Sequence, residues 1–375
     1  MISIDKLLVV LENKIKIVQF VEAFGGGVYT YVKDLSNFLA VHQSDINCEI
    51  HLIYSPNRIE LDKELFHKEI HSDVFLYEID MQRSINLKKD IIVVQKTRRI
   101  LKKIKPDIIH LHSAKAGVIG RLACLRLVSK NNVYYSPHGY SFVQQNISKV
   151  KVLFFKFIEY TMPFLFGGTT VASGNTEFEL SKKIGKSVLV RNGVDFELPD
   201  KIFSPQVNSS LTIGTVGRLT PQKNPKAFNE IALRLPDVNF VWIGNGELID
   251  EITAENITVT GWIRTREELL QKINSLDLYL QVSLWEGLPI AILEAMAMRK
   301  PLVVSNVIGN KDTVDNNYNG FAYDTIDEAV EKITLFFEEK NRFEMGNNSY
   351  LKVFKEYNKK NNFLKLINIY RGIIK

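Results

Sequence analysis

Residues 277–304 read DLYLQVSLWEGLPIAILEAMAMRKPLVV, and this stretch predicts a strand, a loop, a helix and a second strand in succession. The first apolar run ends in a loop that carries Glu286, and Pro289 stands where the first residue of a helix is expected, a favoured position for proline. We expect that helix to run to about Met298. Short apolar strands separated by helices are typical of a parallel sheet covered on both faces.

Two acidic residues lie on either side of the expected helix start, Glu286 before it and Glu294 within it. The unpaired amide groups at a helix N-terminus, together with the helix dipole, favour an anion such as phosphate. Glu294 could then accept hydrogen bonds from a vicinal diol, and Glu286 would lie near the group attached beyond the phosphate. The alternative is a surface helix with two incidental acids, because two acids at this spacing are common.

The same alternation of apolar strands and helices extends outward through most of the chain. The expected strands cover residues 16–21, 49–54, 74–79, 107–112, 133–136, 169–173 and 187–190, then 211–216, 240–243, 257–260, 276–282 and 301–305. The intervening helices are expected at 28–40, 90–104 and 116–129. A polar segment rich in proline and serine, 199–210, is the expected linker. This pattern predicts an α/β protein with two doubly wound, Rossmann-like domains, 1–198 and 211–350, that face each other across a cleft.

Length and composition agree with this division. A chain of 375 residues is long enough for two domains, and 45% hydrophobic with 24% charged residues is ordinary for a globular protein. The two cysteines, Cys48 and Cys124, cannot form a disulfide framework or a Cys-x-x-Cys metal site. We recognise no signal peptide, and the apolar stretch 152–168 is interrupted by charges and proline. A cytoplasmic location is therefore expected.

A second cationic element follows the strand at 211–216, where residues 217–224 read GRLTPQKN. Arg218 offers a planar fork to phosphate oxygens, and Lys223 offers a mobile point charge. Two cations at a strand's carboxyl end can neutralise a leaving diphosphate. The alternative is two solvated surface cations.

Two further loops lie at strand ends in the first half. Gly25, Gly26 and Gly27 follow the first strand and allow backbone amides to approach a ligand, although a plain tight turn is the alternative. Their spacing is not that of a dinucleotide-binding fingerprint. His138, in SPHGYSF, could donate a hydrogen bond to a sugar hydroxyl or a phosphate, although a lone histidine in a loop is more often structural. We interpret two other histidines, at positions 110 and 112, as structural because their strand is apolar.

Taken together, these motifs resemble the retaining glycosyltransferases of family four, which have the GT-B fold. The resemblance spans nearly the whole chain and rests on FGGGVYTYV, KPDIIHLHSAKAG, SPHG, NGVD, GRLTPQKN, WIGNGEL and EGLPIAILEAMAMRKPLVV. The last of these contains the family's E-x7-E motif with both glutamates, Glu286 and Glu294. Met298 and Arg299 depart from the small residue and glycine that many relatives have there.

The resemblance implies a role for each matching position. The residues implied to bind the donor are Gly26, Gly27, Arg218, Lys223, Ile263, Glu286, Gly287, Leu288, Pro289, Ile290 and Glu294. The residues implied in catalysis are Glu286, which contacts the transferred sugar, His138, which lies near C6 of that sugar, and the cations Arg218 and Lys223. Neither a metal ion nor a cofactor is implied.

The implied reaction transfers a sugar from a nucleotide diphosphate sugar to a hydroxyl group, and the anomeric configuration of the sugar is retained. The resemblance favours UDP as the nucleotide of the donor. The resemblance points to bacterial capsule or O-antigen assembly, with a saccharide acceptor on a polyprenyl diphosphate carrier. A glycoside hydrolase would explain the paired acids but not Arg218 and Lys223. A nucleotide-sugar epimerase of the same fold and a catalytically silent subunit of an enzyme pair remain as alternatives.

Charge is divided unevenly along the chain. Residues 1–195 have 27 Lys and Arg against 19 Asp and Glu, residues 196–350 have 14 against 22, and residues 351–375 have 7 against 1. In the GT-B fold the last helix crosses back, so 351–375 would add its charge to the first, acceptor-side domain. With the basic, aromatic-rich stretch 146–166, this predicts an anionic membrane as a peripheral partner. The alternative is that these aromatic residues are buried core. Nucleic acid is disfavoured because no binding module is recognised.

Overall fold

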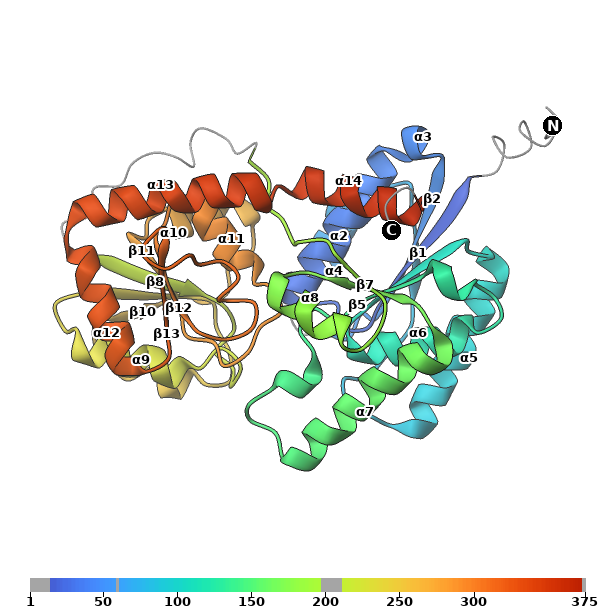
Figure 1. Ribbon diagram of the computed structural model, residues 1–375, viewed down its shortest axis with the longest axis horizontal. Coiled ribbons are helices and arrows are strands. Elements are labelled where there is room, and N and C mark those ends of the chain that lie inside the picture. Colours follow the sequence, from blue (N-terminus) through green and yellow to red (C-terminus); the bar gives the residue numbers. More distant parts are fainter. Residues whose placement is uncertain (1–13, 59–60, 197–210, 373–375) are drawn as a thin grey trace.

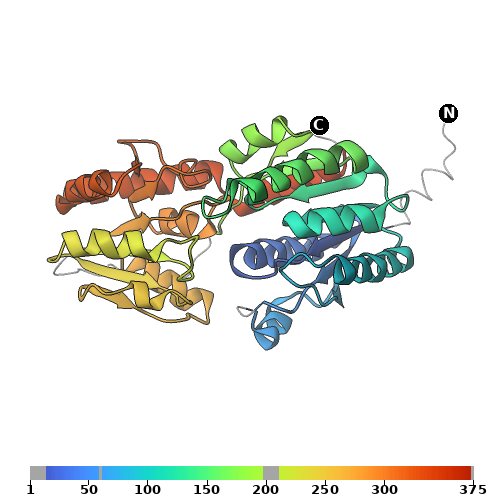
Figure 2. The ribbon, with the colours of Figure 1, turned by 90° about the horizontal axis from the view of Figure 1, so that it is seen from below.

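The computed structural model describes residues 14–58, 61–196 and 211–372, and the expected linker at 199–210 lies outside these ranges. The first domain contains a seven-stranded parallel sheet in the order β3-β2-β1-β4-β5-β6-β7. Its strands are β1 (Ile15–Val21), β2 (Cys48–Tyr54), β3 (Val74–Glu78), β4 (Ile108–His112), β5 (Val133–Ser136), β6 (Thr169–Ala172) and β7 (Ser187–Leu189). Helices cover both faces of the sheet (Figures 1 and 2).

The helices of this domain connect successive strands. They are α2 (Gly26–Val41), α3 (Gln43–Ile46), α4 (Lys63–Glu69), α5 (Leu87–Ile104), α6 (Ala114–Cys124), α7 (Lys149–Phe166) and α8 (Asn175–Lys182). Side chains of β1 alternate between the two faces of the sheet. Ile17 and Val21 join the core beside α2, whereas Val18 and Phe20 join the core beside α5 and α6. The run of apolar residues in β1 is therefore explained, because the strand is buried on both of its faces.

The second domain repeats this arrangement with a six-stranded parallel sheet in the order β10-β9-β8-β11-β12-β13. Its strands are β8 (Thr212–Val216), β9 (Asn239–Ile243), β10 (Ile257–Val259), β11 (Leu278–Gln281), β12 (Leu302–Ser305) and β13 (Gly320–Tyr323). Its helices are α9 (Pro225–Arg234), α10 (Arg266–Asn274), α11 (Ile290–Ala297), α12 (Ile326–Thr334) and α13 (Glu339–Glu356). Two doubly wound domains, as predicted, are confirmed.

Three details differ from the sequence-based expectations. Pro289 is the residue before α11 rather than its first residue, because its ψ of 121° is extended. The helix expected at 116–129 ends at Cys124. The last strand, β13, was not expected, and it pairs with β12 in parallel.

The two C-terminal helices link the domains (Figure 1). The expectation that 351–375 crosses back as a whole is wrong for residues 351–356, because they belong to α13, which packs against α11 in the second domain. Helix α14 (Lys359–Tyr370) then crosses to the first domain, where Leu366 joins the core beside α2. The Tyr134 hydroxyl donates to the Ile369 carbonyl over 3.2 Å, and the Tyr370 hydroxyl lies 2.5 Å from His110 Nδ1. The polypeptide therefore connects the domains twice.

Within the described ranges, every helix is either too short or too polar to cross a bilayer.

The packing of α14 gives a stability prediction. Leu366 is fully buried, whereas Leu364 on the same helix is 40% exposed. Leu366→Ala should lower the free energy of unfolding by about 2–5 kcal/mol, because it leaves a cavity in the core. Leu364→Ala, the matched control, should have a much smaller effect. Urea denaturation followed by circular dichroism compares the two, and equal small losses would show that α14 does not hold the first domain.

Candidate active site

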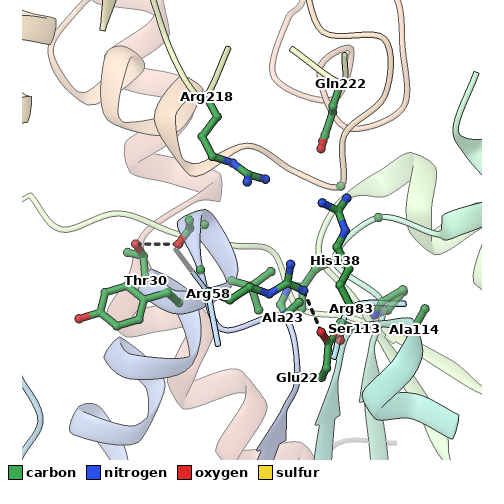
Figure 3. A pocket seen from close by; sticks show the side chains of 18 of the residues that line it. Glu22, Ala23, Thr30, Arg58, Arg83, Ser113, Ala114, His138, Arg218 and Gln222 are labelled. Atoms are coloured by element: carbon green, nitrogen blue, oxygen red, sulfur yellow. Dashed lines mark hydrogen bonds and ion pairs between the residues drawn. The ribbon is translucent and has the colours of Figure 1, made fainter. Parts of the chain in front are cut away.

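A cavity of about 1060 Å³ lies between the two domains, at the carboxyl ends of both sheets. Every residue that the sequence predicted for the site lines this one cavity. They are Gly26, Gly27, His138, Arg218, Lys223, Ile263, Glu286, Gly287, Leu288, Pro289, Ile290 and Glu294. Figure 3 shows side chains of both domains pointing into it, with Arg218 on the side opposite Glu22 and Arg58. The location follows from the topology, because parallel strands present their carboxyl ends at a single edge.

Glu286 is held at the end of β11 by three donors. Lys223 Nζ lies 2.7 Å from Glu286 Oε1, and Gln281 Nε2 donates to the same oxygen over 3.3 Å. Gln222 Nε2 donates to Oε2 over 3.3 Å. Glu286 is only 7% exposed, so it is buried as a charge-paired group. Lys223, predicted to bind diphosphate, is therefore also the counter-ion of Glu286.

Glu294, in α11, is also buried, but its environment differs from that of Glu286. Among the described residues its carboxylate accepts no hydrogen bond, and Arg266 Nη2 lies 3.6 Å from its Oε1. Burial raises the pKa of Glu294, and the charge of Arg266 opposes that rise. A buried carboxylate beside a cavity with unused acceptor sites suits a ligand that carries hydroxyl groups.

Arg266 was missed by the sequence reasoning, although it follows Ile263 by only three residues. It belongs to a charge network that also contains Asp34 on α2, Asp195 and Lys359 on α14. Arg266 Nη1 lies 3.3 Å from Asp195 and 3.8 Å from Asp34. Lys359 Nζ lies 2.7 Å from Asp34 and also pairs with Asp195. This network ties Glu294 to the first domain and to α14, which no local motif could have indicated.

His138 follows β5 in a left-handed conformation, with a φ of 52°. Its Nε2 lies 3.0 Å from His112 Nδ1, and His112 Nε2 lies 2.7 Å from Gln19 Oε1. Burial lowers the pKa of His138 to about 4, so its imidazole is neutral at pH 7. His112 is therefore more than a structural residue of β4, because it orients the ring of His138.

The two domains touch directly beside the cavity. A Cβ atom at Gly287 would lie 2.7 Å from the carbonyl carbon of His138, so only glycine fits there. Nearby, Asn192 Nδ2 donates to the Leu288 carbonyl over 2.8 Å, and Thr176 Oγ1 donates to Asp312 over 2.9 Å.

Two helix starts open toward the cavity, one from each domain. Gly26 begins α2 with a φ of 55°, a conformation that glycine adopts readily. A Cβ at Gly27 would lie 4.0 Å from the Ile290 side chain at the start of α11. The amide groups of both helix starts can therefore bind one anionic ligand. Trp262, which is 54% exposed, lines the same cavity beside Ile263.

Comparison with known proteins agrees with this geometry. Residues 25–198 match the profile described as Glycosyltransferase Family 4, and residues 200–360 match the profile described as Glycosyl transferases group 1. The chain is 32% identical over 310 residues to the UDP-Gal:alpha-D-GlcNAc-diphosphoundecaprenol alpha-1,3-galactosyltransferase of Escherichia coli, with 74% of this chain and 78% of the relative covered. It is 26% identical over 329 residues to the O-antigen biosynthesis glycosyltransferase WbnH of Escherichia coli, with 85% and 88% covered.

A solved structure confirms the GT-B fold. Anabaena Alr3699/HepE in complex with UDP and glucose superposes with a TM-score of 0.74 over 96% of this chain and 100% of that chain, at 16% identity. The chain therefore belongs to the glycosyltransferases of family 4 and group 1.

Proposed function

We propose that this protein transfers a sugar from a UDP-linked donor, with retained configuration, to a hydroxyl of a saccharide on a polyprenyl diphosphate carrier. The observation that carries this proposal is that Glu286, Glu294, Arg218 and Lys223 line one cavity into which α11 opens. The names of the relatives support a lipid-diphosphate acceptor and a place in bacterial surface polysaccharide assembly.

On the donor side, the ribose hydroxyls bind Glu294, whose carboxylate has unused acceptor sites. The diphosphate binds between Arg218, Lys223 and the start of α11, where both charge and backbone amides are available. The base lies beside Trp262 and Ile263. No metal ion is needed in this scheme, because these cations and the helix supply the positive charge that the leaving group requires.

The chemical step breaks the bond between the anomeric carbon and the diphosphate oxygen. The acceptor hydroxyl attacks the same face of the sugar, and its proton passes to the leaving phosphate, so the nucleoside diphosphate departs with that proton. Glu286 holds hydroxyls of the transferred sugar. Neutral His138, oriented by His112, contacts the sugar near C6. The adjoining domain surfaces exclude water from the step.

On the acceptor side, α7 presents an apolar stripe to solvent. Val150, Leu153, Phe157, Tyr160 and Phe164 recur at intervals of three and four residues and are 47–86% exposed. Lys149, Lys151 and Lys156 on the same helix are exposed. Its only acid, Glu159, is buried and accepts a hydrogen bond from the Tyr135 hydroxyl over 2.9 Å. We infer that α7 lies in the headgroup region of an anionic membrane at its cytoplasmic face.

The two glutamates should fail in different ways. Glu294→Ala should weaken UDP binding, because the ribose loses its acceptor, and Glu286→Ala should mainly lower turnover. Each lost hydrogen bond to a charged group corresponds to about 1.5–3 kcal/mol, or roughly ten- to a hundredfold. Calorimetry with UDP and a transfer assay with and without acceptor separate the effects. Exposed Glu344→Ala is the control, and wild-type turnover by the Glu286/Glu294 double variant would contradict the assignment.

The cations should discriminate between nucleotides. Arg218→Ala and Lys223→Ala should lose roughly tenfold or more affinity for UDP while binding uridine almost normally, because only UDP carries the diphosphate. Lys226→Ala, an exposed neighbour that does not line the cavity, is the matched control. Equal losses for UDP and uridine in calorimetry would place the diphosphate elsewhere.

EDTA should leave sugar transfer intact, because the cations and the helix supply the positive charge in this scheme. A loss of activity that Mg²⁺ restores would refute the metal-free scheme.

Liposome flotation tests the membrane surface. The protein should float with anionic vesicles at low salt, and binding should fade as salt screens the lysines. Phe157→Ser with Phe164→Ser should reduce flotation roughly tenfold or more, because two exposed aromatic side chains lose their apolar burial. Phe343→Ser on α13, 72% exposed, is the control. Equal recovery with neutral and anionic vesicles would remove the membrane surface from the proposal.

A further inference from the structure

The cavity described above continues past the donor site into the first domain, where it enters a groove between α5, α6 and α7. We propose that this groove binds the lipid tail of the acceptor and that Arg83, at its inner end, binds the acceptor's diphosphate. The inference rests on the proposed function and names the acceptor subsite, which no motif in the sequence indicated.

Two helices supply apolar side chains at helical spacing on the face toward the groove. Helix α5 contributes Leu87, Ile91 and Val94, and α6 contributes Val118 and Leu122. Leu87 and Ile91 are 75% and 57% exposed, so this contiguous apolar face is open to water. An apolar ligand would remove this surface from water.

Helix α7 forms the opposite wall. Phe154, Phe155 and Ile158 line the groove, and α6 lies between the walls because it packs against both α5 and α7. The residues of α7 that point into the groove differ from those of its outer apolar stripe. One helix therefore presents one face to the groove and another to solvent.

The inner end of the groove is basic. Arg58 pairs with buried Glu22 over 3.0 Å, and Lys115 pairs with Asp90 over 2.7 Å. Lys115 also donates to the carbonyls of residues 82 and 84, over 2.6 and 2.8 Å, and so fixes the segment that carries Arg83. Within the described part of the chain, Arg83 itself forms no hydrogen bond or ion pair. The charge of Arg83 acts on Glu22 without a direct contact, so its guanidinium is the one in this group that can still donate hydrogen bonds to a bound anion.

The groove continues into a second cavity near the start of α7. This second cavity, of about 730 Å³, shares Arg83, Ile85, Gln144, Phe154 and Phe155 with the first and is also lined by Lys151 near the start of α7. A ligand that runs from the sugar site through Arg83 to this second cavity must carry, in order, a saccharide, an anionic linkage and an apolar tail. A lipid-diphosphate saccharide has this order, whereas an apolar protein segment has no anion at the matching place.

Farnesyl diphosphate, inorganic diphosphate and farnesol serve as probes of the full-length protein in calorimetry. Saturating UDP is present, so that the donor site cannot accept the probe's diphosphate. Farnesyl diphosphate should bind roughly tenfold or more tightly than inorganic diphosphate, because its chain enters the groove. Ile91→Ser and Phe154→Ser should remove most of that difference. Arg83→Ala should weaken both diphosphates and leave farnesol unchanged.

Matched variants distinguish specific binding in the groove from non-specific hydrophobic binding elsewhere on the protein. Phe343→Ser, on the second domain, should leave the affinity for farnesyl diphosphate unchanged. Phe157→Ser, on the outer stripe of α7, should lower vesicle flotation without changing that affinity. Equal affinities for farnesyl diphosphate and inorganic diphosphate would overturn the inference, as would equal effects of Phe154→Ser and Phe343→Ser. If UDP binding is unaltered in the same samples, such a result would refute only the inference about the groove. A wild-type protein that does not bind UDP would instead count against the proposed function.

Discussion

The site depends on the contact between the two domains at Gly287. The backbone of this residue lies against that of His138 and Gly139, and a side chain at position 287 would meet atoms of His138 and Gly139 at 2.7–2.9 Å. Gly309 also packs against Gly287. A Cβ atom added to Gly309 would lie 1.9 Å from the carbonyl oxygen of Gly287. Glycines at these positions let the loops meet backbone to backbone. Because of this contact, the histidine of one domain and the glutamates of the other face a single cavity.

The charge network behind Glu294 adds a second connection. Arg266 from the second domain, Asp34 from the first and Lys359 from α14 are near neighbours there. A ribose that binds Glu294 would therefore meet a group already joined to both domains. Since α14 is itself packed into the first domain's core, the carboxylate that we propose to bind the ribose belongs to a network that also joins the domains.

Much of the fold, and the set of residues that line the candidate site, could be predicted from sequence, because the information is local. Residues 278–295 contain a strand, a helix start and two acids in a fixed order, and the periodicity of apolar residues indicated the parallel sheets. Long-range geometry could not be predicted in this way. The pairing of His112 with His138, separated by 26 positions, and the role of Arg266 depend on tertiary contacts. Nor could composition decide whether the aromatic residues of α7 were core or surface; the structure leaves Phe157 and Phe164 exposed.

The activity that we propose for this cavity is the transfer of a sugar, with retained configuration, to a lipid-diphosphate saccharide. It is tested most directly by determining the anomeric configuration of the product by NMR, using a panel of α-linked UDP-sugars and GlcNAc-diphosphoundecaprenol as acceptor. We expect an α-glycoside on the acceptor and an equal amount of UDP. A β-glycoside, or free sugar released at the same rate without acceptor, would contradict it.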